Sequence, residues 1–434
     1  MEQSLRDKVL IVGVNSSKKV QTAPQSQQWS TDNFDMAMEE MINLVKACNM
    51  EPVGRIEQQM ETVNTATYIG TGKVAEVHEM ARALEADVVV FDNGLSPIQL
   101  RNLQRELDCP VMDRTTLILE IFSTRARTRE AKLQVEVARL QYMLPRLVGL
   151  HDALSRQGGA SGAMSNKGAG EKKLELDRRK LEQRLTTMKR ELDQIAQERK
   201  TQRKRRALSG IPRVALVGYT NAGKSTIMNT LLAAYGEDEE KKVFEKDMLF
   251  ATLDTTVRRI APPGKSAFLL SDTVGFISNL PHSLVKAFRS TLAEVKEADL
   301  LVHVADYSDE NYREHIKVTQ ETLRELGAEK IPVLYVLNKA DLCGMGETAI
   351  VQGEHVYMSA KSQSGRETLV DLIAKKLSGG YKDCEMIIPY ERGDIVSYLN
   401  DHAVVQDAEY KEDGVHIHAN ISLIDSGRYE QYIV

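Results

Sequence analysis

The feature that most constrains this chain is a short apolar strand that runs into a glycine-rich loop and then a helix. Residues 214–217 supply the strand, and residues 226–234 have the composition of the helix. The loop follows the pattern GxxxxGK[ST] and comprises Gly218, Tyr219, Thr220, Asn221, Ala222, Gly223, Lys224 and Ser225. Glycines there let backbone N–H groups wrap phosphate oxygens at a helix N-terminus. The pattern predicts a nucleotide site in which Lys224 reaches the β- and γ-phosphates and Ser225 binds Mg²⁺.

Three further motifs follow, each after an apolar strand-like segment, and one of them, NKxD, favours GTP over ATP. Asp341 can accept hydrogen bonds from guanine N1–H and N2–H₂, a pairing that adenine does not offer. Asp272 can hold Mg²⁺ through water, while the amide of Gly275 can meet the γ-phosphate. The motifs are DxxG (Asp272, Thr273, Val274, Gly275), NKxD (Asn338, Lys339, Ala340, Asp341) and SAK (Ser359, Ala360, Lys361), the last resembling a loop that backs the guanine O6.

A threonine that senses the γ-phosphate is expected between the first two motifs. It must offer its hydroxyl to Mg²⁺ and its amide to the phosphate, so its loop becomes ordered only with the triphosphate. We select Thr252 by its position, with Thr255 and Thr256 as alternatives on chemistry alone. The surrounding predicted contacts are Phe250, Ala251, Thr252, Leu253 and Asp254. Lys224, Thr252 and Gly275 are therefore the predicted catalytic residues.

The residue after DxxG departs from a common pattern. Ras-like GTPases place there a glutamine that orients the attacking water. This chain has Phe276, which cannot hydrogen-bond water, so we expect slow turnover that waits for an external stimulus. Asn221 resembles the asparagine with which some such GTPases use K⁺ in place of an arginine finger, which makes K⁺ a candidate cofactor.

Charge is distributed unevenly. The chain carries −5 overall, yet residues 125–206 hold 22 basic and 10 acidic residues, a net +12. The remainder therefore carries −17. A basic segment in an acidic protein favours a salt-dependent contact with a polyanion over a merely solvated face. The residues that we expect to contact RNA are Lys167, Lys172, Lys173, Arg203, Lys204, Arg205 and Arg206.

The same segment has the spacing of two amphipathic helices. A Gly/Ser-rich stretch at 157–170 separates them, so we expect an antiparallel hairpin with a functional tip loop. The apolar positions are Leu133, Val137, Leu140, Leu144 and Leu147 in the first helix, and Leu174, Leu181, Leu185, Met188, Leu192 and Ile195 in the second.

Length predicts several domains, and alternating strand-like segments (9–12, 88–91) and helix-like segments (35–48, 73–84) predict an α/β protein. Its 434 residues are 42% hydrophobic and 27% charged, and no apolar run nears the ~18–20 residues that span a bilayer. The four cysteines lack CxxC spacing, which fits a reducing, cytoplasmic location. We expect four parts: an N-terminal α/β domain (1–115), a basic helical hairpin (116–208), a P-loop GTPase domain with a doubly wound, mostly parallel sheet (209–380) and a small α+β domain (381–434).

With these motifs, the chain resembles the HflX family of ribosome-associated GTPases, in the Obg–HflX group. The resemblance extends over most of residues 60–375. It is carried by YIGTGK (68–73), FDNGLSP (91–97), DRTT (113–116), RART (125–128), KLQVE (132–136) and LPRL (144–147). One departure lies at 168–175, where GAGEKKLE stands in place of the family's GPGE stretch; losing the proline frees the loop and the lysines change its charge. GTGK at 70–73 lacks the P-loop spacing and predicts a turn before a helix rather than an ATP site.

The resemblance implies binding of GTP and Mg²⁺, hydrolysis stimulated by the ribosome, and association with the large ribosomal subunit and its RNA. We expect the protein to be a monomer. It also implies splitting or rescue of stalled ribosomes. Two other functions stay open from the sequence. One is an assembly checkpoint factor that binds subunits without splitting ribosomes, and the other is a GTPase that acts on a protein or membrane partner without RNA.

Overall fold

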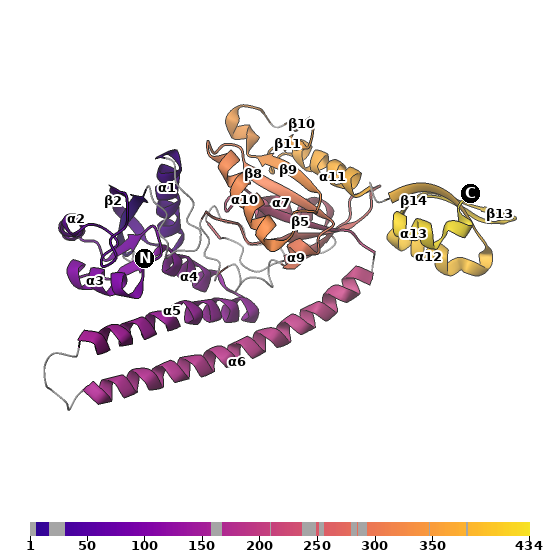
Figure 1. Cartoon of the computed structure of the whole chain (residues 1–434). Coiled ribbons are helices and arrows are strands. Elements are labelled where there is room, and N and C mark those ends of the chain that lie inside the picture. The colour runs from indigo at the N-terminus through magenta and orange to yellow at the C-terminus, as the bar shows by residue number, and fades with distance from the viewer. Residues whose placement is uncertain are drawn as a thin grey trace, which may run out of the picture. The chain divides into compact units, whose positions relative to one another are not determined.

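The computed structural model describes residues 6–16, 31–157, 167–208, 210–236, 249–250, 256–278, 284, 293–346, 348–378 and 381–434. These form two compact units (Figure 1). The first comprises Met1–Ala196, Met248–Leu253 and Ser278–Arg289, and the second comprises Gln197–Asp247, Asp254–Ile277 and Ser290–Val434. The four-part division expected from the sequence stays a prediction.

The first unit is built on a parallel four-stranded sheet. Val- and Ile-rich segments suit strands that are buried on both faces, and the core includes Leu10, Val12, Val89 and Phe91. In sheet order the strands are β2 (Glu51–Met60), β1 (Lys8–Ser16), β3 (Val88–Phe91) and β4 (Val111–Asp113). The helices between them are α1 (Thr31–Ala47), α2 (Thr71–Ala83) and α3 (Pro97–Leu107), followed by α4 (Arg114–Arg125). The strands and helices expected at 9–12, 88–91, 35–48 and 73–84 are confirmed, and Gly70 caps α2 as the expected turn.

The predicted hairpin consists of α5 (Arg129–Gln157) and α6 (Lys167–Leu208) (Figure 1). Ion pairs join Arg129 to Glu191 at 2.9 Å and Arg184 to Glu136 at 3.1 Å. From residue 129 to residue 136 of α5, the paired residue on α6 moves back from 191 to 184, so the two helices are antiparallel. The second helix starts at Lys167, so the end of the glycine-rich stretch expected as a loop (157–170) is helical. Glycine inside a helix costs about 0.5–1 kcal/mol relative to alanine, which other residues of a long helix can offset.

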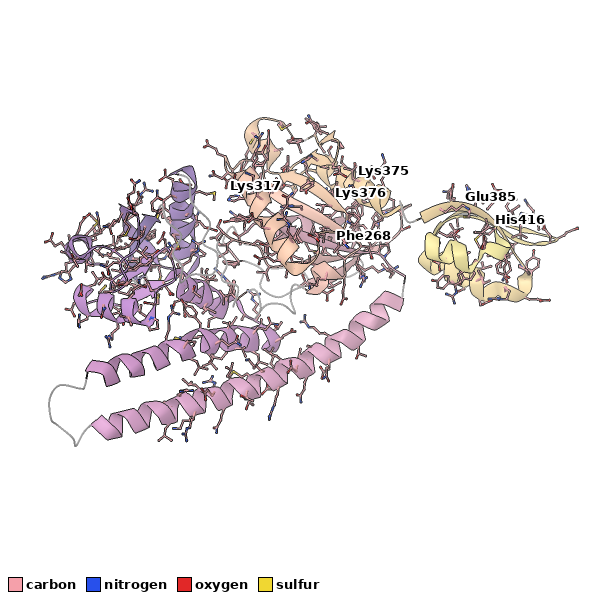
Figure 2. The ribbon with its side chains drawn as sticks, viewed as in Figure 1. Phe268, Lys317, Lys375, Lys376, Glu385 and His416 are labelled. Carbon is pink, nitrogen blue, oxygen red and sulfur yellow. The ribbon has the colours of Figure 1, made fainter. Side chains whose placement is uncertain are left out.

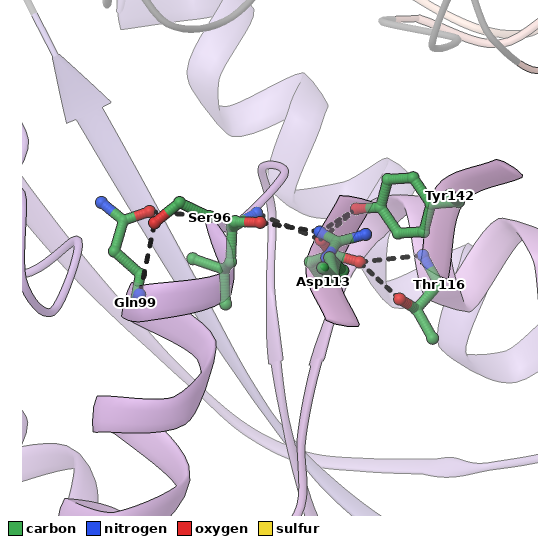
Figure 3. A network of polar contacts seen from close by, with 7 residues as sticks. Ser96, Gln99, Asp113, Thr116 and Tyr142 are labelled. Carbon is green, nitrogen blue, oxygen red and sulfur yellow. Dashed lines mark hydrogen bonds and ion pairs between the residues drawn. The ribbon is translucent and has the colours of Figure 1, made fainter. Parts of the chain in front are cut away.

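One carboxylate fastens α5 to the sheet edge of the same unit (Figure 3). Asp113, at the end of β4, accepts hydrogen bonds from the backbone and hydroxyl of Thr116, from Tyr142 and, at 2.6 Å, from Arg146. The amide of Leu95 donates to the same carboxylate at 3.1 Å. Burial raises the pKa of Tyr142, so its hydroxyl stays a donor. A fully satisfied carboxylate therefore fixes the middle of α5.

The second unit holds a seven-stranded sheet. Its order is β10 (Ile350–Gln352), β11 (His355–Tyr357), β9 (Val333–Asn338), β8 (Leu300–Asp306), β5 (Arg213–Gly218), β7 (Phe268–Asp272) and β6 (Thr256–Ile260). The sheet is parallel except for the antiparallel edge pairs β10–β11 and β6–β7. Its core includes Phe268 (Figure 2). The described helical elements are α7 (Lys224–Tyr235), α9 (Ala293–Lys296), α10 (Tyr312–Leu326), η2 (Ala340–Cys343) and α11 (Gln363–Ser378).

The chain ends in a small antiparallel sheet of order β12 (Tyr381–Ile388), β14 (Gly414–Ser422) and β13 (Val404–Lys411). Val415 and Ile417 are buried while His416 and His418 are not, which matches the alternation in the sequence. The flanking helical elements are η3 (Tyr390–Arg392), α12 (Gly393–His402), α13 (Leu423–Arg428) and η4 (Glu430–Tyr432). The predicted fold class is thereby confirmed.

Candidate nucleotide-binding site

The glycine-rich loop joins the carboxyl end of β5 to the N-terminus of α7. Gly218 has φ 143° and Gly223 has φ 94°, conformations that L side chains rarely adopt. A Cβ at Gly218 would lie 2.1 Å from the carbonyl oxygen of Val304, and one at Gly223 would lie 2.2 Å from Nδ2 of Asn338. Both glycines are therefore required by their surroundings, and the loop leaves the backbone free to approach a phosphate chain.

Lys224 begins α7 and is buried in this loop. Its Nζ donates to the carbonyl oxygens of Gly218 (3.1 Å) and Tyr219 (2.6 Å), so its ammonium lies inside the loop curve. Burial lowers the pKa of Lys224 to about 8, and the nearby Asp272 acts in the opposite direction. We propose that this ammonium contacts the β- and γ-phosphates.

Two oxygen donors suited to Mg²⁺ meet beside Lys224. The Ser225 hydroxyl donates to Oδ2 of Asp272 at 2.8 Å, which brings the P-loop and the DxxG motif together. Hydroxyl and carboxylate oxygens are hard ligands, and Mg²⁺ is usually held by one or two such groups plus substrate phosphates. The residues present therefore fit the ion. We propose Ser225 as a direct ligand and Asp272 as a ligand through water.

The rest of DxxG is fixed against the loop. Thr273 is buried and donates its hydroxyl to the carbonyl of Leu216 at 2.7 Å. A Cβ at Gly275 would lie 2.8 Å from Cα of Thr220 and 3.0 Å from Nζ of Lys224. Only glycine fits this approach. Val274 and Phe276 are also buried, so Phe276 packs into the domain as its apolar side chain requires.

Asn338 joins three motifs through one side chain. Its Nδ2 donates to the carbonyl of Ala222 in the P-loop at 2.9 Å. Its Oδ1 accepts from the amide of Ala360 in the SAK motif, also at 2.9 Å. Asn338 is itself buried at the end of β9. The P-loop, 116 residues before Asn338, and the SAK motif, 22 residues after it, are therefore joined with NKxD in one assembly.

The residues expected to read guanine differ in burial. Asp341 and Lys361 are exposed, while Ala340, Ser359 and Ala360 are buried. Lys339 has φ 62° and its Nζ pairs with Asp306 at 2.6 Å. An exposed carboxylate beside a buried backbone frame can receive a base edge, so we propose that Asp341 binds guanine.

Two features of the site are not apparent from sequence motifs. Asp306, which orients Lys339, ends the apolar strand β8, and its place at the carboxyl edge of a parallel sheet is a signal that could have identified it. The second is a stack of Tyr219 on His315, with ring centroids 3.9 Å apart and an interplanar angle of 13°. His315 lies on α10, and no spacing in the chain marks it as a neighbour of the P-loop.

Some predicted residues lie outside the described part of the chain. Ala251, Thr252, Leu253 and Asp254 are among them, as is Thr255, whereas Phe250 is described and buried. The predicted RNA contacts Lys167, Lys172, Lys173, Arg203, Lys204, Arg205 and Arg206 all lie on α6, in the backbone conformation of a helix.

A parallel-centred sheet that carries a P-loop, DxxG, NKxD and SAK in one assembly defines a P-loop GTPase. Four family models match the chain in succession. They are described as GTP-binding GTPase N-terminal (35–123), GTP-binding GTPase Middle Region (125–206), 50S ribosome-binding GTPase (213–339) and HflX C-terminal domain (345–432). The chain belongs to the HflX family of GTPases, and it binds and hydrolyses GTP.

Relatives named GTPase HflX match over nearly the whole chain. The protein from Caldanaerobacter subterraneus subsp. tengcongensis is 38% identical over 100% of this chain and 96% of its own. The one from Escherichia coli is 38% identical over 91% and 92%. A crystal structure of a GTP-binding protein from Sulfolobus solfataricus in complex with GDP aligns over 86% of this chain and 98% of that one, with 23% identity and a TM-score of 0.43. Within the described ranges, no helix has the length and apolarity to cross a membrane.

Proposed function

We propose that this GTPase, in its GTP-bound form, associates with the large ribosomal subunit and splits or rescues stalled ribosomes. The observation that carries the proposal is the net +12 of residues 125–206 in a chain of −5. The family model for residues 213–339 is described as a 50S ribosome-binding GTPase, which supports the same partner. The basic residues of α6 contact ribosomal RNA, and the protein works in the cytoplasm as a monomer that is partly ribosome-bound.

GTP acts as the switch through the residues of the site. Lys224 binds the β- and γ-phosphates, and the Gly275 amide and Thr252 meet the γ-phosphate, so residues 245–256 and 272–280 take up their order with GTP. Mg²⁺, held by Ser225, Thr252 and, through water, Asp272, neutralises phosphate charge when bound. Asp341 selects guanine. Hydrolysis ends the order of these segments and releases the protein from the ribosome.

Turnover is slow without the ribosome. Phe276 stands where a water-orienting glutamine would be, and its side chain is buried. Asn221 is exposed in the P-loop with φ 61°. It coordinates K⁺, which serves as a substitute positive charge. Binding to the ribosome completes the arrangement of the catalytic residues.

Sedimentation tests the proposal against the checkpoint alternative. Intact ribosomes are incubated with the protein and a non-hydrolysable GTP analogue and then run on a sucrose gradient. Splitting empties the whole-ribosome peak into free subunits. A checkpoint factor leaves that peak intact and comigrates only with free subunits, and that result would replace splitting with subunit binding.

Charge reversal tests the RNA contact. We expect the variant Arg203→Glu/Lys204→Glu/Arg205→Glu/Arg206→Glu to lose ribosome binding in pelleting assays, because phosphate contacts supply salt-dependent affinity. The matched control Arg203→Lys/Arg205→Lys/Arg206→Lys preserves charge and should preserve binding. Unchanged binding by the reversed variant would favour a GTPase that acts on a protein or membrane partner without RNA.

A further inference from the structure

In the first unit, two charged side chains hold the peptide groups on both sides of Ser278. Nη2 of Arg114 donates to the carbonyl oxygen of Ser278 at 2.9 Å. Oε1 of Glu40 accepts from the amide of Ser278 at 3.3 Å. Arg114 and Glu40 are joined to each other at 2.6 Å, which closes a ring. We name Glu40, Arg114 and the backbone of Ser278 the Ser278 clasp.

All three residues of the Ser278 clasp are buried, so the loss of one partner is costly. Glu40 is 8%, Arg114 4% and Ser278 2% exposed. A buried ion pair adds little net stability, because desolvation offsets the Coulomb attraction, but loss of one partner costs about 3–5 kcal/mol. Its contacts to Ser278 are to backbone atoms, so they depend on the path of the chain and not on the serine side chain. The contacts of the Ser278 clasp therefore depend on where the backbone of Ser278 lies.

The backbone runs from Ser278 back to the nucleotide site within a few residues. In the second unit, the amide of Phe276 donates to Gly218 at 3.1 Å, and the amide of Thr220 donates to Phe276 at 2.9 Å. Gly275 lies against Thr220 and Lys224, as its tight Cβ position shows. Only Ile277 separates Phe276 from Ser278, and two residues span at most about 7 Å. We therefore expect a displacement of Ser278 to displace the backbone of Gly275 as well.

The helix that supplies Arg114, α4, makes a second contact beside a segment that should respond to GTP. Phe122, also on α4, meets Phe250 edge-to-face with ring centroids 4.7 Å apart. Both rings are buried. Phe250 begins the segment in which the γ-phosphate-sensing threonine is expected. One helix of the first unit thus contacts the chain beside both segments that should respond to GTP.

We propose that Glu40 and Arg114 are positioning residues for GTP hydrolysis. By fixing Ser278 they hold the Gly275 amide where the γ-phosphate reacts, while the P-loop and Asn338 bind the nucleotide without them. Catalysis depends on donors placed before the reaction, and a displacement of about 1 Å can cost about 100-fold in rate. The proposal uses the GTPase activity alone and does not depend on the ribosome.

Steady-state hydrolysis by the full chain is the first test. Glu40→Gln keeps the size of the side chain but weakens its hold on Arg114 and on the Ser278 amide. We expect kcat to fall about tenfold and KM for GTP to change less than about twofold. Arg146→Lys is the matched control, since it perturbs another buried ion pair of the first unit, with Asp113, and removes none of the hydrogen bonds of the Ser278 clasp. The control should retain kcat.

A second variant guards against misfolding. Glu40→Leu/Arg114→Met replaces the pair by apolar side chains and leaves no unpaired buried charge, a change that is often neutral for stability. We expect it to stay folded, with one cooperative melting transition, although the Ser278 peptide groups lose these two partners, and still to lose kcat. Unchanged or raised kcat in a folded variant, or an equal loss in Arg146→Lys, would overturn the proposal.

Hydrogen exchange on the unmodified protein supplies a readout that a purely structural pair would not move. With a GTP analogue in place of GDP, we expect stronger protection of the Ser278 amide and of α1 around Glu40. Equal protection in the two nucleotide states would contradict a link between the clasp and the nucleotide site.

Discussion

At the scale of single residues, a few buried polar side chains link distant parts of the chain through hydrogen bonds. Asn338 uses its amide nitrogen for the P-loop and its amide oxygen for the SAK motif. Each buried group would be left without a partner if the side chain were shortened, which costs about 1–3 kcal/mol per group. The shape of the nucleotide site is therefore sensitive to one residue that lies at its centre.

Asn338→Ala should weaken GTP and GDP binding together, by at least about tenfold, because it loosens the P-loop and not a contact to the γ-phosphate. Titration with fluorescent GTP and GDP measures both affinities. Gln320→Ala, which removes an exposed hydrogen bond to Tyr335 in the same unit, serves as the control and should bind normally. A selective loss of GTP affinity would contradict this role.

Asp92 makes stability depend on pH. It follows β3, and burial raises its pKa from 3.8 to about 7, although the amide of Val14 donates to it and Arg114 also favours its charged form. Between about pH 4 and 7 the folded protein therefore holds a proton that the unfolded chain has released. The free energy of unfolding must fall as pH rises through this window.

Asp92→Asn should flatten that dependence, because an amide does not titrate. Urea unfolding across about pH 4.5 to 8 measures the slope for both proteins. We expect the unmodified protein to lose more stability than the variant over the rise from about pH 5 to 7. Parallel curves for the two proteins would show that Asp92 has an ordinary pKa.

At the scale of elements, the first helix of the hairpin, α5, is fixed to the first unit by polar contacts as well as by apolar packing. It buries Ala131, Val135 and Ala138, and the Asp113 network fixes it near Arg146 (Figure 3). Pro145 stands inside this helix. Since proline removes one helical hydrogen bond, the neighbouring contacts to Asp113 compensate in holding the helix at that point.

Arg146→Ala should loosen α5 locally. It leaves the buried Asp113 carboxylate without its cation, at a cost of about 3–5 kcal/mol. Hydrogen exchange should show faster exchange in the middle of α5 with little change in the seven-stranded sheet. Arg129→Ala, at an exposed ion pair with Glu191, should change exchange very little. Uniform protection in both variants would show that apolar packing alone holds α5.

At the scale of the whole molecule, the sequence predicted what is local and missed what is distant. The P-loop and DxxG could be recognised because their chemistry demands fixed spacing within a strand–loop–helix context. The contacts of Ser278 with Arg114 and Glu40 span 164 and 238 residues, and no periodic pattern records them. The Tyr219–His315 stack is similar. Long-range pairs depend on how finished elements pack, so they appear only in the structure.

The unit boundaries also show this limit. Ser278–Arg289 follows DxxG within the segment that sequence patterns assign to one GTPase domain, but its contacts place it in the first unit. Composition does not change at Ser278, so no sequence signal marks the transition. This arrangement is what makes the first unit a candidate partner of the GTP cycle.

GTP turnover in K⁺ buffer tests whether this GTPase is slow alone and is activated by the ribosome. Phosphate release is measured with the protein alone, with large ribosomal subunits and with empty ribosomes. We predict slow basal turnover and strong stimulation by large subunits or ribosomes. Basal turnover that stays slow and unstimulated in their presence would contradict this prediction.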